Sequence, residues 1–204
     1  TINAVTISGG TDRNDALGGA GILAGSVWST PRDSLNLTNC VVTDNHVFQP
    51  ASAFTLQPGG GLHMAGGDLT ITNCTFSNNS SAASQGGAVA YIAPEIGGTV
   101  SITGSTFTGN SVINISASGP VGGGALYINS DNSAPNTITI SNSTFNNNFT
   151  TSISSGTAYG GAILFNTGIL TIEKSTFTGN SASGAGGQGG AIYVILALSL
   201  AFFV

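Results

Sequence analysis

Carboxylates are the first side chains to consider, because paired acidic groups supply acid–base catalysis or bind calcium in polysaccharide-degrading enzymes. The 204-residue chain has 8 acidic and 3 basic side chains. Its one local cluster, Asp12, Arg13 and Asp15, is more simply interpreted as a solvated loop than as a site. The acidic residues are Asp12, Asp15, Asp33, Asp44, Asp68, Glu95, Asp131 and Glu173. None recurs at one phase of the sequence repeat described below, so we predict no catalytic site, no cofactor and no enzymatic function.

The two histidines do not change this prediction. His46 and His63 occupy different phases of the repeat, whereas a metal-binding or catalytic histidine needs a partner at a fixed position. Polysaccharide cleavage that depends on Asp44 or Asp68 is therefore the least favoured of three functional hypotheses.

Composition restricts the class of protein. The net charge is −5, only 5% of residues are charged and 40% are hydrophobic. Three cations cannot form the basic patch that binding to nucleic acid requires. The apolar content argues against disorder, and the length suits a single domain or one run of small repeats. The polar surface must consist mostly of uncharged hydroxyl and amide groups.

Two phrases alternate along the chain. The first alternates apolar residues with Thr, Ser or Asn, and Asn follows three residues after it. Its five copies occupy residues 35–42, 69–76, 100–107, 138–145 and 170–177. The second places glycines before a short apolar run, with copies at residues 60–64, 87–91, 124–128, 161–165 and 190–194 and a degenerate copy at 19–23. Copies of the first phrase lie 31 to 38 residues apart, and a solenoid accommodates such variation in loops.

The alternation within each phrase predicts short strands with one buried face. Equivalent strands should stack in parallel, about 4.8 Å apart, with a right-handed crossover. We therefore predict an all-β fold over residues 1–194, a right-handed parallel β-helix of five to six coils. Each coil should have three short strands, with a bend near Asn73 or Asn142. The glycine pairs should supply positive φ angles where loops re-enter the sheet.

Stacking of coils predicts ladders of equal side chains. Leu69, Ile71 and Phe76 should point inward, with Val89 and Tyr91 from the next glycine phrase. Buried amides need partners, which explains a recurring Asn that bonds to its neighbours above and below. The expected aromatic ladder is Phe76, Phe107, Phe145 and Phe177, and the expected amide ladder is Asn45, Asn79, Asn110, Asn148 and Asn180.

Cys40 and Cys74 share one phase in neighbouring coils, where later coils have Ser105, Ser143 and Ser175. One rung apart, their Cα atoms would be about 5 Å from each other, which is within the range for a disulfide. In-register side chains in parallel strands do not always orient suitably for the bond. The sequence leaves open a disulfide or a buried thiol ladder, and two isolated cysteines do not indicate a metal site.

The paired phrases resemble the repeats of polymorphic outer membrane proteins of the chlamydial type, which have Gly-Gly-Ala-Ile and Phe-X-X-Asn signatures. The first signature occurs at residues 160–163 and 189–192, with variants at 86–89 and 123–126. The second occurs at residues 76–79, 107–110, 145–148 and 177–180, with a weakened copy at 42–45. The resemblance covers roughly residues 18–194. It implies a surface-displayed β-helical domain, often adhesive.

Two outer surfaces could bind a ligand. A threonine-rich array should face outward from the Ser-Thr-Phe strands, similar to arrays in ice-binding proteins, although β-propensity alone explains threonine on a solvated face. The residues proposed for this face are Thr75, Thr106, Thr108, Thr144, Thr176 and Thr178. A second, partly aromatic stripe could bind glycan or protein unless loops cover it: His63, Ala90, Tyr127, Leu164 and Tyr193.

The ends of the sequence do not resemble polar caps. Residues 1–7 have the pattern of a strand, and the apolar segment 195–204 could be a terminal coil, a contact between subunits or a truncated membrane anchor. Solenoids usually need polar caps, so we expect either a fragment of a longer solenoid or head-to-tail stacking into a filament. Seven Asn-X-Ser/Thr sequons begin at Asn36, Asn73, Asn78, Asn79, Asn114, Asn142 and Asn148. Because the chain is rich in Asn, Ser and Thr, most of these tripeptides (sequons) are expected from composition alone. They are therefore only weak evidence of secretion.

The sequence thus favours a non-catalytic, extracellular or cell-surface β-solenoid with a structural or adhesive role. Its ends should contact either further copies, end to end, or neighbouring coils of a longer chain, and it could bind glycan or a cell surface. A binding module for ice or glycan is the second hypothesis. We expect no binding to nucleic acid.

Overall fold

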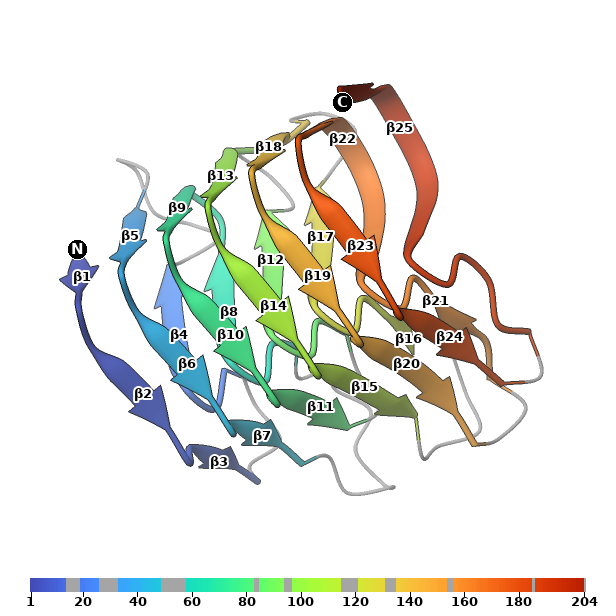
Figure 1. Ribbon diagram of the computed structural model, residues 1–204, viewed down its shortest axis with the longest axis horizontal. Helices are drawn as coiled ribbons and strands as arrows, with labels where there is room; N and C mark the ends of the chain where they lie inside the picture. The colour runs from blue at the N-terminus through green and yellow to red at the C-terminus, as the bar shows by residue number, and fades with distance from the viewer. Residues whose placement is uncertain are drawn as a thin grey trace.

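The computed structural model describes residues 1–13, 19–25, 33–48, 58–82, 85–93, 97–114, 121–130, 135–153, 156–184 and 186–203. These residues form successive coils of a β-solenoid, and no helix occurs among them (Figure 1). Consequently no helix in this part of the chain could cross a membrane. The predicted stack of parallel strands is confirmed, and each coil contains the three predicted strands together with one further short strand.

Sheet A, the 11-stranded sheet, contains two of the predicted strands of each coil. The Leu-Thr-Ile strands are β1 (Ile2–Asn3), β5 (Ser34–Thr38), β9 (Asp68–Thr72), β13 (Thr99–Thr103) and β18 (Thr137–Ser141). The glycine-phrase strands are β4 (Ile22–Gly25), β8 (Leu62–Ala65), β12 (Val89–Ala93) and β17 (Leu126–Ser130). Two longer strands, β22 (Ile163–Glu173) and β25 (Ile192–Phe203), run through both positions.

Sheet B, a six-stranded sheet, contains the Ser-Thr-Phe strands, the third of each coil. Its strands cross the front of the molecule in Figure 1, each beside its equivalent in the next coil. Phe76, for example, pairs with Val42 on one side and with Phe107 on the other. The strands are β2 (Thr6–Ser8), β6 (Val41–Thr43), β10 (Thr75–Ser77), β14 (Thr106–Thr108), β19 (Thr144–Asn146) and β23 (Thr176–Thr178).

Sheet C, also six-stranded, adds to each coil a short strand that the sequence pattern does not predict. Its sequences are variable and rich in Ser and Thr, so they carry little apolar alternation. The strands are β3 (Thr11–Asp12), β7 (His46–Val47), β11 (Ser80–Ala82), β15 (Ser111–Asn114), β20 (Phe149–Ser152) and β24 (Ser181–Ser183). A further pair, β16 (Val121–Gly122) and β21 (Ala158–Tyr159), forms a small parallel sheet.

Residues in the left-handed region make the two corners of sheet B. At the corner between sheets A and B, Asn73 and Asn142 have φ angles of 52° and 49°, which confirms the predicted bend. At the corner between sheets B and C, Asn78 and Asn147 have φ angles of 54° and 52°. Asparagine tolerates this conformation better than most residues. The sharp corners let each coil turn without interrupting the stacking of its neighbours.

The glycine pairs serve two purposes. The first member, such as Gly86 or Gly123, has a φ angle of 69° in both cases, as predicted. The second member, such as Gly87, does not have a positive φ angle. A Cβ atom at Gly87 would instead collide with the backbone oxygen of Gly124 in the next coil. Close approach between coils therefore explains the second glycine.

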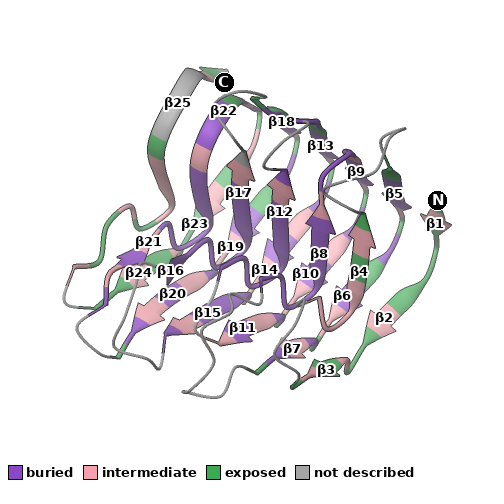
Figure 2. Cartoon of the chain, turned by 180° about the vertical axis from the view of Figure 1, so that it is seen from behind, coloured by how far each residue is buried: buried purple, intermediate pink, exposed green. Residues whose placement is uncertain are grey.

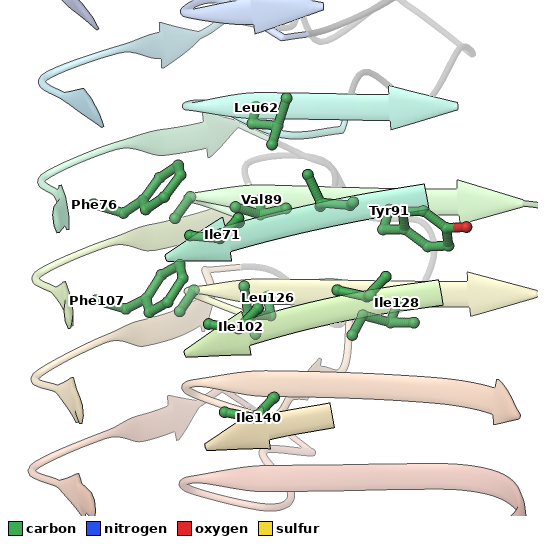
Figure 3. Packing of buried hydrophobic residues seen from close by; sticks show 14 of the residues in the cluster. Leu62, Ile71, Phe76, Val89, Tyr91, Ile102, Phe107, Leu126, Ile128 and Ile140 are labelled. Carbon is green, nitrogen blue, oxygen red and sulfur yellow. The ribbon is translucent and has the colours of Figure 1, made fainter. Parts of the chain in front are cut away.

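The core lies inside the coils, where equivalent apolar side chains form columns. Ile71, Ile102 and Ile140 are fully buried and make one such column (Figure 3). Buried residues concentrate in the middle coils, whereas strands of the first coil are mostly half-buried or exposed (Figure 2). Residues 195–203, part of the apolar segment, continue β25, which pairs in parallel with β22.

Candidate binding surface

The recurring asparagines form a hydrogen-bonded ladder along the inside of the corner between sheets B and C. Asn79 and Asn110 have no exposed surface. The Nδ2 of Asn79 donates to Oδ1 of Asn110 at 3.0 Å and to the carbonyl oxygen of Val42 at 2.9 Å. Equivalent side-chain bonds of 2.9–3.0 Å join the ladder from Asn45 to Asn180. From Asn79 to Asn180, each amide also accepts a bond from the backbone N–H of the preceding Asn, and Asn45 accepts one from the backbone N–H of Gly10.

The phenylalanines stack beside this ladder. Ring centroids of Phe76 and Phe107 lie 5.0 Å apart, and those of Phe107 and Phe145 lie 4.8 Å apart. Phe177 continues the stack at 4.7 Å. The planes are nearly parallel, with angles between 2° and 8°. Phe177 is half-buried, whereas the other three have no exposed surface.

A second ladder, of sulfur and hydroxyl groups, follows the corner between sheets A and B. The backbone N–H of Cys40 donates to Sγ of Cys74 at 3.3 Å, and that of Cys74 donates to Oγ of Ser105 at 3.1 Å. Ser143 and Ser175 continue it at 3.1 Å. Each side chain also donates to the carbonyl oxygen two residues earlier, as Ser105 does to Thr103 at 2.9 Å. Cysteine and serine thus perform one structural role.

Both cysteines are buried free thiols in the structure. The Sγ of Cys74 donates to the carbonyl oxygen of Thr72 at 3.2 Å, and the Sγ of Cys40 donates to that of Thr38 at 3.2 Å. Burial raises the pKa of the Cys74 thiol, which disfavours the reactive thiolate. The geometry therefore corresponds to the thiol ladder, one of the two alternatives left open by the sequence.

The threonine face occupies the outer side of sheet B. Thr75, Thr106 and Thr108 are half-buried, and Thr144, Thr176 and Thr178 are exposed. Every strand of this sheet pairs with its neighbours without a register shift. Some hydroxyls bond to one another, as Ser77 Oγ does to Thr43 Oγ1 at 2.8 Å. The structure thus brings the six candidate residues together on one regular, uncharged face.

The second candidate surface, the partly aromatic stripe, is mostly covered, which is the alternative that the sequence leaves open; only Tyr193 is half-buried. His63 and Tyr127 are only 9% and 8% exposed, and Ala90 and Leu164 are buried. Ala90, Tyr127 and Leu164 form a small cluster outside sheet A, packed against Tyr159 and Tyr193. The prediction that these side chains point away from the main core is correct, but other residues cover them. Burial raises the pKa of Tyr127 to about 12.

Two acidic residues bond to threonines at separate places in the solenoid. Oδ1 of Asp68 accepts bonds from the N–H and the hydroxyl of Thr99 at 2.9 and 2.7 Å, and Asp44 accepts from Thr43 at 2.9 Å. No group of three or more potential metal ligands occurs among the described residues. Asp15, Glu95 and Asp131 lie outside the described residues.

A small apolar pocket on sheet C was not predicted. It has a volume of about 270 Å³ and is lined by Val47, Phe48, Ser80, Ser81, Ala82 and Ile113. At its edge, Nδ1 of His46 lies 2.7 Å from Oγ of Ser80, and the Arg13 guanidinium lies 5.3 Å from the centre of the Phe48 ring. These residues come from adjacent coils, so only knowledge of the register of sheet C would have brought them together.

Comparison with protein families gives two matches to one repeat. The Chlamydia polymorphic membrane protein repeat matches residues 73–90 and 174–195. Each match begins at the corner before sheet B and extends through the Phe and Asn ladders to a glycine-phrase strand. Comparisons with curated proteins and with solved structures find no significant match. At these two places, therefore, the chain carries the polymorphic membrane protein repeat.

Proposed function

We propose that this chain is a non-catalytic β-solenoid displayed at the cell surface, where it has a structural or adhesive role. The observation that carries the proposal is the repeat itself, because each matched segment corresponds to most of one coil. Repeats of this kind belong to a membrane-protein family, and a rigid solenoid presents long regular faces for contact. The polar side chains that recur in phase form the Asn and Cys/Ser ladders, which support the coil.

The threonine face is the surface that we assign to adhesion. It is regular, and its protruding side chains are hydroxyls, methyl groups and one amide, Asn146. A ligand that repeats along the coils, such as a glycan polymer or an ice surface, could contact many rungs at once. The weak contacts at each coil then add up to a higher total affinity. Because the face is already ordered, binding does not have to order a flexible surface.

Adhesion through this face can be tested with Thr106→Glu combined with Thr108→Glu. Both side chains are half-buried on the outer side of β14, so charge should block close contact while the fold remains. We expect the labelled chain to lose at least tenfold in binding to a printed glycan array or in inhibition of ice recrystallisation. Ser101→Glu combined with Thr103→Glu, on the outer side of β13 in the same coil, is the matched control. Unchanged binding by the Thr106/Thr108 variant would contradict this assignment.

End-to-end stacking of copies is the second part of the proposal. Large apolar side chains are about half exposed in the first and last coils of the described solenoid, including Val5, Leu23, Ile195 and Phe202. Open strand edges accept further parallel strands. A second copy placed coil on coil would cover these side chains and extend all three sheets.

A further inference from the structure

The structure divides the asparagines of the Asn-X-Ser/Thr tripeptides into exposed and buried ones. An Asn-X-Ser/Thr sequence is the acceptor signal for N-linked glycosylation, which requires the asparagine at an accessible surface. Asn73 and Asn142 are exposed, whereas Asn79, Asn114 and Asn148 have no exposed surface. Composition alone cannot make this distinction, because all five begin the same tripeptide pattern.

The two exposed asparagines occupy equivalent corners between sheets A and B. Both have positive φ angles, of 52° and 49°, and each precedes a strand of sheet B by two residues. The hydroxyl residue of each sequon, Thr75 or Thr144, therefore lies on the outer side of that strand. The acceptor amide and the hydroxyl residue are both on the outside of the coil.

The buried sequons are incompatible with a glycan. The Nδ2 of Asn148 donates to Oδ1 of Asn180 at 3.0 Å and to the carbonyl oxygen of Phe107 at 2.9 Å, and Asn79 makes the equivalent two bonds. A sugar on either nitrogen would replace one of these donors and would not fit in the closed interior. Such a modification must therefore prevent the ladder from forming.

The other two sequons are less suitable. Asn78 is exposed, but Oγ of Ser80 in its sequon lies 2.7 Å from Nδ1 of His46. Asn36 is only partly exposed, on the outer side of β5.

We propose that Asn73 and Asn142 are attachment sites for N-linked oligosaccharide, a proposal that rests on the extracellular location proposed above. In the transfer, Nδ2 forms a bond to the anomeric carbon of a lipid-diphosphate-linked oligosaccharide. The bond from that carbon to the diphosphate oxygen breaks, the lipid diphosphate leaves, and one amide proton passes to a base of the transferase. The two glycans would project from one edge of the threonine face, in coils separated by a single coil.

A new glycosylation site can be introduced as a control at the corner between sheets A and B. Lys174 occupies the equivalent position two residues before β23, with a φ angle of 46° and an exposed side chain. Ser175 and Thr176 follow it, so Lys174→Asn completes a new sequon in the same geometry. Thr75→Ala and Thr144→Ala remove the two natural sequons and leave both asparagines in place.

The experiment is to secrete the 204-residue chain, with an added leader, from a eukaryotic host and to measure site occupancy by glycopeptide mass spectrometry. We expect glycans at Asn73 and Asn142 and unmodified Asn79 and Asn148 in secreted material with a β-sheet circular dichroism spectrum. Each Thr→Ala variant should lose one glycan, and Lys174→Asn should gain one. Secreted, folded chain without glycan at both Asn73 and Asn142 would overturn the proposal, as would folded chain modified at Asn79 or Asn148.

Occupancy in this host is independent of where the chain is displayed naturally. A failure of the glycosylation proposal is therefore distinguishable from a failure of the surface role, which labelling of intact native cells tests separately.

Discussion

Asn110 illustrates how much of this fold depends on one side chain. Its Nδ2 donates to Oδ1 of Asn148 at 2.9 Å and to the carbonyl oxygen of Phe76 at 3.0 Å. Its Oδ1 accepts from the backbone N–H and from Nδ2 of Asn79, both at 3.0 Å. A buried amide that satisfies partners in the coils on either side cannot be removed without leaving several polar groups unpaired.

We therefore expect Asn110→Ala to lower the free energy of unfolding by roughly 2–4 kcal/mol. Chemical denaturation followed by circular dichroism measures this loss. Asn146→Ala is the matched control, because Asn146 lies on the outer side of sheet B and is partly exposed; its effect should stay within about 0.5 kcal/mol. Equal effects of the two substitutions would show that the ladder contributes nothing specific.

For single strands, the sequence predicts those whose pattern recurs in every coil and misses those that have no recurring pattern. The positions of Leu69, Ile71 and Phe76 follow from alternation alone, because one buried face is repeated in every coil. The strands of sheet C are short and lack that alternation. Tyr127 is buried in a small cluster with Ala90 and Leu164, and Tyr159, which lies far along the chain, packs against this cluster. No local pattern reports such contacts, so the sequence leaves open whether the stripe is exposed or covered.

The same reasoning limits how well the candidate surfaces could be predicted. The outward threonines of sheet B follow from the period of two, and the structure places all six on one face. The pocket beside Phe48 depends on how three strands of sheet C, β7, β11 and β15, lie side by side. The short Ser- and Thr-rich sequences of sheet C carry no pattern that predicts this register.

A prediction at this scale concerns the aromatic stack within sheet B. Phe107 lies between the parallel rings of Phe76 and Phe145, whereas Phe177 stacks on Phe145 and is half-buried. Phe107→Ala should lower the free energy of unfolding by about 3–5 kcal/mol, since it leaves a cavity in a closed column. Phe177→Ala should cost clearly less, because solvent can fill the space. Denaturation midpoints of the two variants give the comparison, and a larger loss for Phe177→Ala would refute the column as described.

At the scale of the whole molecule, the coils form a stack whose length could grow by adding copies. Negative-stain electron microscopy of the purified chain over a dilution series tests the proposed stacking. We expect fibres a few nanometres wide that persist on dilution, because coil-on-coil contact extends all three sheets. Short single rods at every concentration would contradict the stacking and leave adhesion to be carried by single molecules.

The proposed role requires that this solenoid lies outside the cell. The most direct test is immunogold labelling of intact, unpermeabilised cells that produce the chain naturally, with an antibody raised against the folded protein. We predict gold particles on the outer surface, at a density that permeabilisation does not increase. Labelling that requires permeabilisation would contradict a surface role and would leave the fold without its proposed function.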